Sequence, residues 1–350
     1  MIKDRNIDPG ASIGIDKLGF PNIISGKHTD GSLPKIIWVA KGGADAAGAT
    51  GVSKQGSRDE PFLTIGGASG ALTYTVDGRG DRIIVGPGIW RENLDFGSGT
   101  GTTGSAGRMN KRDIGLYGSG GAHAGRTQIV SDGATAGPTI RVRTGYLRGF
   151  VLADLEVGNV DTADADRAQP LMDLETSSTA VLTANLSDHW ATLRNVRLVS
   201  DTTGTMGLVL TGTQMLNTYD LVVAGVIRGI VFRQSLENRP DHCNFYHTRF
   251  QDNVTYDLGT LLNPGPGVWT GPADGTIGSM SNINFFYTKY LDRGGTPVTN
   301  YVNVVGTMVN CGDYEFTAAR DVADDTLMAL PVDWIAIGRS AAAAEFIIGA

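Results

Sequence analysis

Cysteine, basic charge and long apolar runs are all scarce in this sequence. Two cysteines in 350 residues, Cys243 and Cys311, are too few for a disulfide framework or a cysteine metal cluster, so we expect two free thiols. Asp and Glu outnumber Lys and Arg by 36 to 29, which argues against a nucleic-acid partner, because such proteins need a basic surface. No apolar run approaches the roughly 20 residues of a membrane span, and the first residues lack the apolar core of a signal peptide. We therefore expect no membrane partner and synthesis in a cytoplasm.

Long amphipathic helical stretches are also nearly absent, whereas glycine is abundant. The 49 glycines are spread along the chain and, with Asn, Asp and Ser, end short apolar runs such as Ile83-Ile84-Val85. Short strands separated by turn residues predict an all-β protein, which can be a sandwich, a barrel or a solenoid.

A six-residue pattern distinguishes between these architectures. It reads apolar, any, polar, apolar or Thr, any, usually apolar, and successive copies start 19, 22, 25, 27 and 40 residues apart. Positions four and six share one face of a strand, and position one joins them inside only if the chain bends at position three. Asp and Asn, which tolerate left-handed backbone, hold position three in four of the copies. The copies are Leu152–Val157, Leu171–Thr176, Leu193–Leu198, Thr218–Val223, Phe245–Phe250 and Phe285–Tyr290, and the four residues are Asp154, Asp173, Asn195 and Asp220.

One bend per repeat describes one coil of a parallel β-helix, in which each coil has three short strands and three turns. The step of 40 residues contains Asn263-Pro-Gly-Pro-Gly267, which we interpret as an excursion from one coil. The pattern predicts three parallel sheets along residues 80–312. Four side chains should lie in the core on successive coils: Val157, Leu198, Val223 and Phe250.

Residues 36–96 carry a more specific signal. Ile36–Gly43 is followed by Gly56-Ser-Arg-Asp-Glu-Pro-Phe-Leu-Thr-Ile65 and then by Gly80-Asp-Arg-Ile-Ile-Val-Gly-Pro-Gly-Ile-Trp-Arg-Glu92. This order resembles the first coils of the pectin-lyase-like superfamily, which implies a right-handed parallel β-helix. Members of that superfamily often cover the open end of the core with an amphipathic helix after Thr-Ile. Gly66–Leu72 is too rich in glycine for a good helix, so we expect the preceding arm or another protein to cover that end.

The two ends of the chain differ from the repeats between them. Val322–Thr326, Leu327–Pro331 and Phe346–Gly349 resemble the opening strands of the small β-sandwich that ends many phage tailspike and fibre proteins. We therefore divide the chain into an extended N-terminal arm (1–35), a β-helix (36–312) and a short C-terminal β-element (313–350). The arm has isolated apolar side chains that need a surface to cover them, and we expect them to dock on a virion: Ile13, Ile15, Leu18, Phe20, Ile23 and Ile24.

Catalysis on a β-helix usually means cleavage of a polysaccharide. Glycoside hydrolysis requires two carboxylates about 5–5.5 Å apart for retention, or 6.5–9.5 Å apart for inversion. Glu156 and Glu175 share position five of the pattern and would stack about 4.8 Å apart on adjacent coils. Later copies hold basic or apolar residues at this position, which is typical of a solvated face of mixed charge. We therefore expect no catalytic residues, although the same region also contains Asp154, Asp161, Asp164, Asp166 and Asp173.

Two smaller motifs have competing interpretations. Asp241, Cys243 and His247 share a strand parity and are candidate metal ligands, but no fourth ligand is apparent, so we expect no metal and no cofactor. The adhesion tripeptide Arg79-Gly80-Asp81 falls inside the Gly-Asp strand start of the superfamily resemblance, and we interpret it as structural.

An arm, a β-helix and a terminal β-element together resemble a tailspike-like phage virion protein, and such proteins are typically trimers. We expect a non-catalytic homotrimer that decorates or cements the capsid exterior by binding the major capsid protein. Residues 317–350 should pack against a neighbouring subunit through Leu327, Leu330, Trp334 and Phe346. One alternative is a receptor-binding spike, or a glycan hydrolase or lyase, that acts on host surface polysaccharide. The other is a bacterial carbohydrate-active β-helix unrelated to phage.

Overall fold

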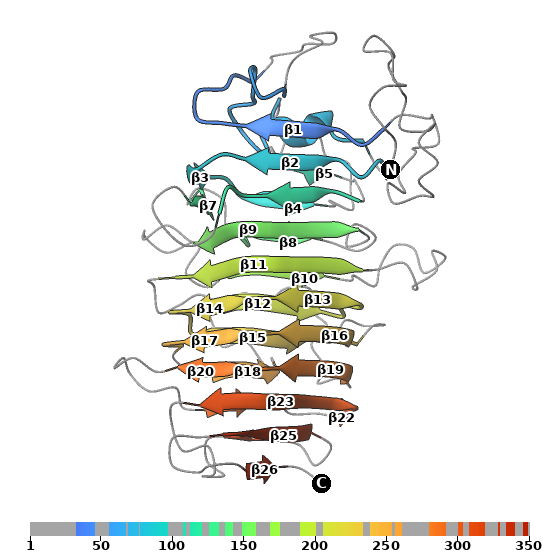
Figure 1. Cartoon of the computed structure of the whole chain (residues 1–350), viewed down its shortest axis with the longest axis vertical. Coiled ribbons are helices and arrows are strands. Elements are labelled where there is room, and N and C mark those ends of the chain that lie inside the picture. Colours follow the sequence, from blue (N-terminus) through green and yellow to red (C-terminus); the bar gives the residue numbers. More distant parts are fainter. Residues whose placement is uncertain are drawn as a thin grey trace, which may run out of the picture.

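The chain winds into a right-handed parallel β-helix, a stack of coils that runs from the N-terminal to the C-terminal end of the molecule (Figure 1). The fold class predicted from the sequence is thereby confirmed. This computed structural model describes residues 33–45, 56–67, 69–76, 78–96, 108–109, 113–120, 126–132, 137–142, 149–158, 169–175, 190–200, 206–233, 239–253, 256–260, 280–291, 300–303, 308–318, 328–329, 334–339 and 346–348.

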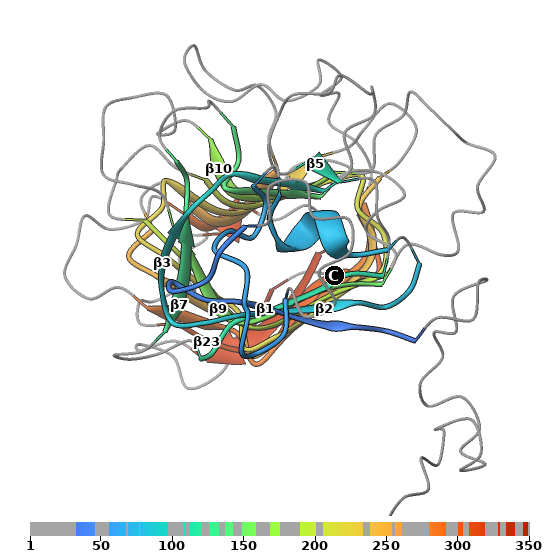
Figure 2. The same ribbon diagram turned by 90° about the horizontal axis from the view of Figure 1, so that it is seen from above.

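Each coil adds one rung to three parallel sheets, which surround the core on three sides (Figure 2). The first and second sheets join in one 17-stranded sheet, because three long strands run through both of them: β9 (Phe150–Gly158), β11 (Ala191–Val199) and β23 (Cys311–Ala318). The first sheet otherwise contains β1 (Ile36–Val39), β2 (Arg82–Val85), β6 (Gly115–Tyr117), β13 (Leu216–Tyr219), β16 (Asp241–Tyr246), β19 (Met280–Phe286), β22 (Met308–Val309) and β25 (Trp334–Arg339).

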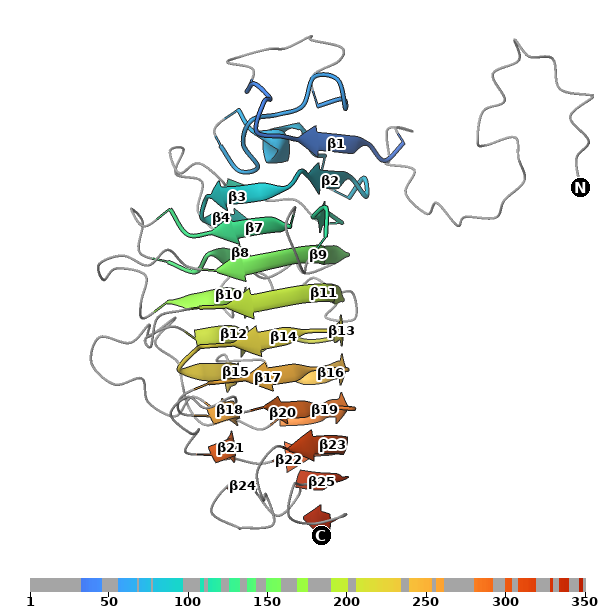
Figure 3. The ribbon, with the colours of Figure 1, turned by 60° about the vertical axis from the view of Figure 1, so that its left-hand side comes forward.

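The second and third sheets complete the coil. The second contains β3 (Gly88–Arg91), β7 (Thr127–Val130), β14 (Val222–Ala224), β17 (Arg249–Gln251) and β20 (Lys289–Leu291). The third has nine strands, and its position opposite the other two is visible in Figure 3. These are β4 (Leu94–Phe96), β5 (Arg108–Met109), β8 (Ile140–Val142), β10 (Pro170–Glu175), β12 (Met206–Thr211), β15 (Arg228–Arg233), β18 (Tyr256–Thr260), β21 (Asn300–Asn303) and β24 (Met328–Ala329).

The bend between the first and second sheets lies at position three of the repeat, as the sequence predicts. Asp154, Asn195 and Asp220 have φ angles of 59°, 50° and 56°, in the left-handed region that Asp and Asn tolerate. His247 and Tyr287 take the same conformation in the next two coils. The prediction fails for the copy at 171–176. Its Asp173 lies in β10 of the third sheet and makes no such bend, so Leu152 pairs directly with Leu193, 41 residues further on.

The core is one continuous column of apolar side chains from Ile37 to Phe316. Val157, Leu198, Val223 and Phe250 are fully buried and pair in register from coil to coil, which confirms their predicted place. The inner rings also follow the stack, since Phe245 lies 4.3 Å from Phe285 between ring centroids.

A short turn of 3-10 helix, η3 (Ala71–Tyr74), closes the N-terminal end of this column (Figure 2). Ala71 and Leu72 are fully buried, and their backbone N–H groups donate to the carbonyls of Thr64 and Ile65. The expectation that the glycine-rich segment leaves this end to another element is therefore wrong. A Cβ atom at Gly67 would lie 2.3 Å from the Thr64 hydroxyl oxygen, so glycine is what lets the chain fold closely over the end.

The stack continues beyond residue 312, into the segment 313–350 for which the sequence predicts a separate β-element. Trp334–Arg339 of β25 pairs in parallel with β23, and β24 pairs in parallel with β21. The last described strand, β26 (Phe346–Ile348), pairs with β25 in the antiparallel direction. In the part of the chain that the structure describes, no helix is long and apolar enough to cross a membrane.

Candidate functional site

Glu156, the strongest catalytic candidate, is held in an ion network on the outer side of the second sheet. Only 2% of its side chain is exposed, and its carboxylate accepts hydrogen bonds from Arg126 and Gln128, each at 2.8 Å. The Arg197 guanidinium lies 3.4 Å away on the next rung. Burial raises the pKa of Glu156, and the two arginines oppose that change. The contacts of this carboxylate are those of a structural ion pair.

Glu175 is not its partner. It lies in β10 of the third sheet, where its rung neighbour is Thr211, whereas Glu156 lies between Gln128 and Arg197 in the second sheet. The expected stacking of the two acids is therefore wrong, because the copy of the pattern at 171–176 belongs to another side of the same coil. Asp173 is fully buried beside Arg141, at 3.3 Å, and Asp161, Asp164 and Asp166 lie outside the described residues.

The proposed metal ligands also point in different directions. Cys243 faces the core and is fully buried, whereas Asp241 contacts its neighbour His242 at 3.0 Å and the Ser281 hydroxyl at 2.6 Å. His247 is itself the bend residue of its coil and stacks on Tyr287. The left-handed backbone of His242 breaks the strand parity on which the hypothesis depended. Within the described ranges no three His, Cys, Asp or Glu side chains lie close enough to hold a metal ion.

Both cysteines are free and buried in the core. Burial raises the pKa of the Cys243 thiol to about 12, so this thiol is a poor nucleophile at neutral pH. Cys243 lies in β16 and Cys311 in β23, which pair with β19 on opposite sides, so a whole rung separates the two cysteines.

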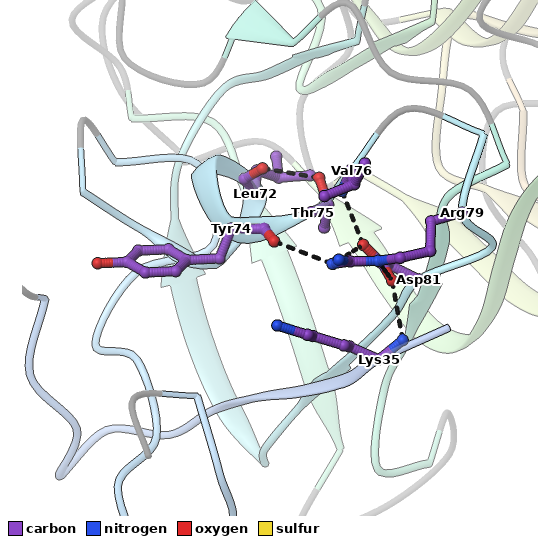
Figure 4. A network of polar contacts seen from close by, with 7 residues as sticks. All are labelled: Lys35, Leu72, Tyr74, Thr75, Val76, Arg79 and Asp81. Carbon is purple, nitrogen blue, oxygen red and sulfur yellow. Dashed lines mark hydrogen bonds and ion pairs between the residues drawn. The ribbon is translucent and has the colours of Figure 1, made fainter. Parts of the chain in front are cut away.

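The tripeptide Arg79-Gly80-Asp81 belongs to a buried network of hydrogen bonds and is not an exposed motif (Figure 4). The fully buried Asp81 carboxylate accepts hydrogen bonds from the Arg79 guanidinium and from the backbone N–H groups of Lys35 and Val76. Arg79 also donates to the carbonyl of Tyr74 at the end of η3. The network fixes the start of β1 to the closing turn, which leaves Arg79 and Asp81 inaccessible to a receptor.

The outward face of the first sheet carries the most unusual surface of the described residues. Side chains at one register position lie one above another along the whole stack, and all but one of them are apolar or aromatic. We call this column the apolar stripe. Its residues are Trp38, Ile84, Tyr117, Ala153, Arg194, Tyr219, Tyr246, Phe286, Tyr314 and Ile337.

In a sheet with one solvated face, apolar residues that point inward usually alternate along each strand with polar residues that point outward. The stripe departs from this rule, because its outward residues are apolar. Tyr219 is 42% exposed, and most of the other members are half-buried, whereas the residue before each member from Trp38 to Tyr314 is buried. The stripe's only charged member, Arg194, contacts the Asp154 carboxylate at 3.2 Å. The stripe therefore presents apolar surface without an uncompensated charge.

Four rings form the C-terminal half of the stripe and stack face to face. Tyr219, Tyr246, Phe286 and Tyr314 are separated by 5.3, 5.1 and 5.4 Å between ring centroids, with planes tilted by 8°, 11° and 19°. Each inner ring has both faces covered by its neighbours, so ring edges and phenol groups are what the surface presents. A sugar that stacks on an aromatic ring needs a free face, and the inner rings offer none.

Sequence reasoning identified the inward positions of the repeat and missed this outward column. The signal was present at position two of the pattern, where Tyr219, Tyr246 and Phe286 follow one another in successive copies. The other predicted interaction residues are not tested. Ile13, Ile15, Leu18, Phe20, Ile23, Ile24, Leu327 and Leu330 lie outside the described residues, and for Trp334 and Phe346 the structure places only the backbone, in β25 and β26.

Comparisons with known proteins add only remote structural matches. No protein-family model matches the chain, and no curated protein sequence is significantly similar to it. A pectin methylesterase solved with a hexasaccharide is 14% identical, with 88% of this chain and 90% of that chain covered and a TM-score of 0.42. The pectin methylesterase of Erwinia chrysanthemi is 11% identical (89% and 91% covered, TM-score 0.41), and that of carrot is 13% identical (86% and 88% covered, TM-score 0.38). Similarity at this level carries no information on activity.

Proposed function

We propose that this chain is a non-catalytic structural protein of a phage virion, a homotrimer that decorates the capsid exterior. In this proposal the N-terminal arm binds the major capsid protein, and the β-helix projects away from the shell. The tailspike-like organisation of the sequence supports a virion setting, and the N-terminal end of the stack supports the docking direction.

The observation that carries the proposal is the exposed apolar surface of the first coil. Leu33, Ile36 and Leu63 are 51%, 59% and 42% exposed, although η3 already closes the core at this end of the stack. These side chains are therefore not needed to seal the end, and burying each against a partner would contribute up to about 1.5–3 kcal/mol. Leu33, the first described residue, lies beside this coil, and the arm is the segment that ends there, which supports docking of both on one surface.

The principal alternative is an enzyme that cleaves host surface glycan. The arrangement around Glu156 supports the non-catalytic proposal, because a catalytic acid must reach its substrate and this carboxylate is enclosed by arginines. We expect no cleavage of host lipopolysaccharide or capsule by the purified protein, measured by release of reducing ends or unsaturated sugars. Cleavage that the Glu156→Gln or Glu175→Gln variant abolishes would replace the structural proposal with the enzymatic one.

The docking role is tested with particles that lack this protein. Full-length chain added back should decorate them in electron micrographs, whereas a chain without residues 1–30 should fold and assemble but leave them bare. A full-length variant with Leu18→Asp, Phe20→Asp and Ile23→Asp keeps the length of the arm and should also fail to bind. Full occupancy by either variant contradicts docking through the arm, and unfolding of both assigns the arm to the stability of the stack.

A further inference from the structure

We infer that the apolar stripe is the face through which three copies of this chain pack side by side, parallel, around a common three-fold axis. The inference rests on the homotrimer of the proposed function and names its contact surface. It places the lateral contact on the outward side of the first sheet, over the length of the stack, whereas the sequence led us to expect it at residues 317–350.

The three outward faces differ in what they offer a partner. On the third sheet the outward side chains Val209 and Val231 are themselves fully buried, in a second apolar cluster. On the second sheet the outward column holds Arg197, Arg249 and Lys289. Among the described residues, the outward column of the first sheet has the most apolar side chains that are half-buried or exposed, with only Ala153 fully buried and only Arg194 charged, so this face gains most from being covered.

The occupant that fits this face best is a second copy of the same stack. Rungs of a parallel β-helix repeat about every 4.8 Å, and the stripe presents one side chain per rung over ten rungs. A partner with another fold matches that spacing over only a few rungs, whereas a parallel copy matches it throughout. A three-fold rotation leaves the height of each rung unchanged, so the edge of each of the four stacked rings meets the edge of the same ring in the neighbouring copies.

The area available is also sufficient for stable association. Ten rungs about 4.8 Å apart and five strand residues about 3.3 Å apart define a face of roughly 700 Å². Two neighbours share this face in a trimer, so three copies together bury roughly 2,100 Å², compared with a total of about 1,600 Å² for a standard interface between two chains. Polar side chains at the margin of this face would keep hydrogen-bond partners when it is covered. The Asn244 amide already donates to the Asn217 amide oxygen at 3.2 Å, and Arg194 has its Asp154 partner.

The distribution of residues along the stripe favours parallel packing. The four stacked rings lie in its C-terminal half, so parallel copies bring rings against rings, whereas an antiparallel pair brings Tyr314 against the coils of Ile84 and Tyr117. Parallel copies also place all three apolar N-terminal ends on the same side. Three arms then reach one surface, and weak single contacts combine into firm attachment.

Cross-linking of introduced cysteines tests this parallel packing directly. The two native thiols are buried, so cross-links should form only through the introduced cysteines. Tyr219→Cys and Tyr314→Cys are each expected to form disulfide-linked dimers with themselves under mild oxidation of the full chain. Lys289→Cys, on the second sheet, is the control and should stay monomeric on a non-reducing gel. Antiparallel packing would instead leave Tyr314→Cys unlinked by itself and link it to Ile84→Cys in a mixture of the two variants, and no cross-linking at either stripe position contradicts the inference.

A matched pair of double variants tests what holds the copies together. Tyr246→Lys with Phe286→Lys places two charges in the stripe and should yield a folded monomer, with the circular dichroism of the wild type. Arg249→Glu with Lys289→Glu changes the outward face of the second sheet in the same two coils and should remain trimeric. A stripe variant that stays trimeric overturns the inference. Docking is measured in a separate experiment, as the occupancy of particles in electron micrographs. A trimer that stays intact but does not bind particles would contradict the proposed function and would leave this inference standing.

Discussion

Single residues in left-handed backbone conformation turn each coil from the first sheet to the second. Asp154, Asn195 and Asp220 hold this position in three coils, and Tyr287 holds it with a φ of 60°. A residue other than Gly, Asn or Asp pays roughly 1–2 kcal/mol for this conformation. In the case of Tyr287, stacking on His247 at 5.1 Å between ring centroids helps to offset that cost.

Asn195→Val is therefore expected to destabilise the protein by roughly 1–2 kcal/mol, because a β-branched side chain is strained in left-handed backbone. Asn195→Gly should be nearly neutral, since glycine adopts this conformation freely. Melting temperatures at one fixed scan rate measure both variants. Equal loss in the two variants would mean that the Asn195 side chain, and not the backbone angle, is what matters.

One buried acid makes the stability of the stack depend on pH. Asp313 is fully buried in the core, and the Tyr290 hydroxyl donates to its carboxyl group at 2.5 Å. Burial raises its pKa from 3.8 to about 7, with hydrogen bonds from Tyr290 and Thr288 acting in the opposite direction. The folded state therefore binds this proton more tightly than the unfolded state does.

Stability should fall as pH rises from about 4 to about 7 and should level off above that, because Asp313 must ionise in the folded core. The difference between a pKa of about 7 and 3.8 corresponds to roughly 4 kcal/mol at most. Asp313→Asn should remove this slope in thermal unfolding between pH 4 and 8. The exposed Asp220→Asn serves as control, and a slope that persists in Asp313→Asn would show that other groups cause it.

At the scale of elements, the closing turn η3 protects the N-terminal edge of the stack. Its buried residues sit over the first coils, and the Asp81 network ties it to the start of β1. In a stack where each coil contacts only its neighbours, damage at one end should stay local.

Leu72→Ala should cost about 2–4 kcal/mol in the coils beneath the turn, because it leaves a cavity at the end of the core. Hydrogen exchange should therefore speed up in β1 and β2 and stay unchanged in β19 and β23. Leu33→Ala, at a residue that is half exposed, is the control and should change neither. Uniformly faster exchange along the chain would show that the stack unfolds as one unit.

The elements also show how far the sequence leads. Alternation and bend residues predict the coils from Leu193 onward in the correct register, because inward positions must be apolar in every coil. They misplace the copy at Leu171, since a strand of the third sheet has the same alternation as one of the first. The sequence pattern does not predict the apolar stripe, because outward positions of a repeat are usually solvated and nothing within one repeat shows that a face is continuous over ten rungs.

At the scale of the whole molecule, the stack has two surfaces with different proposed partners. The N-terminal end, with its exposed apolar side chains and the arm, is proposed to contact the virion. The outward side of the first sheet is inferred to contact other copies. Both depend on a closed assembly, because an uncovered stripe in a monomer would expose aromatic edges over half its length.

The solution mass of the untagged full-length protein tests this dependence most directly. Light scattering or sedimentation at micromolar concentration should give about 111 kDa, three times the 36.9 kDa of one chain, with no concentration dependence over a tenfold dilution. A mass of 36.9 kDa under these conditions would contradict the account, because it would leave the apolar stripe without the partner that explains it.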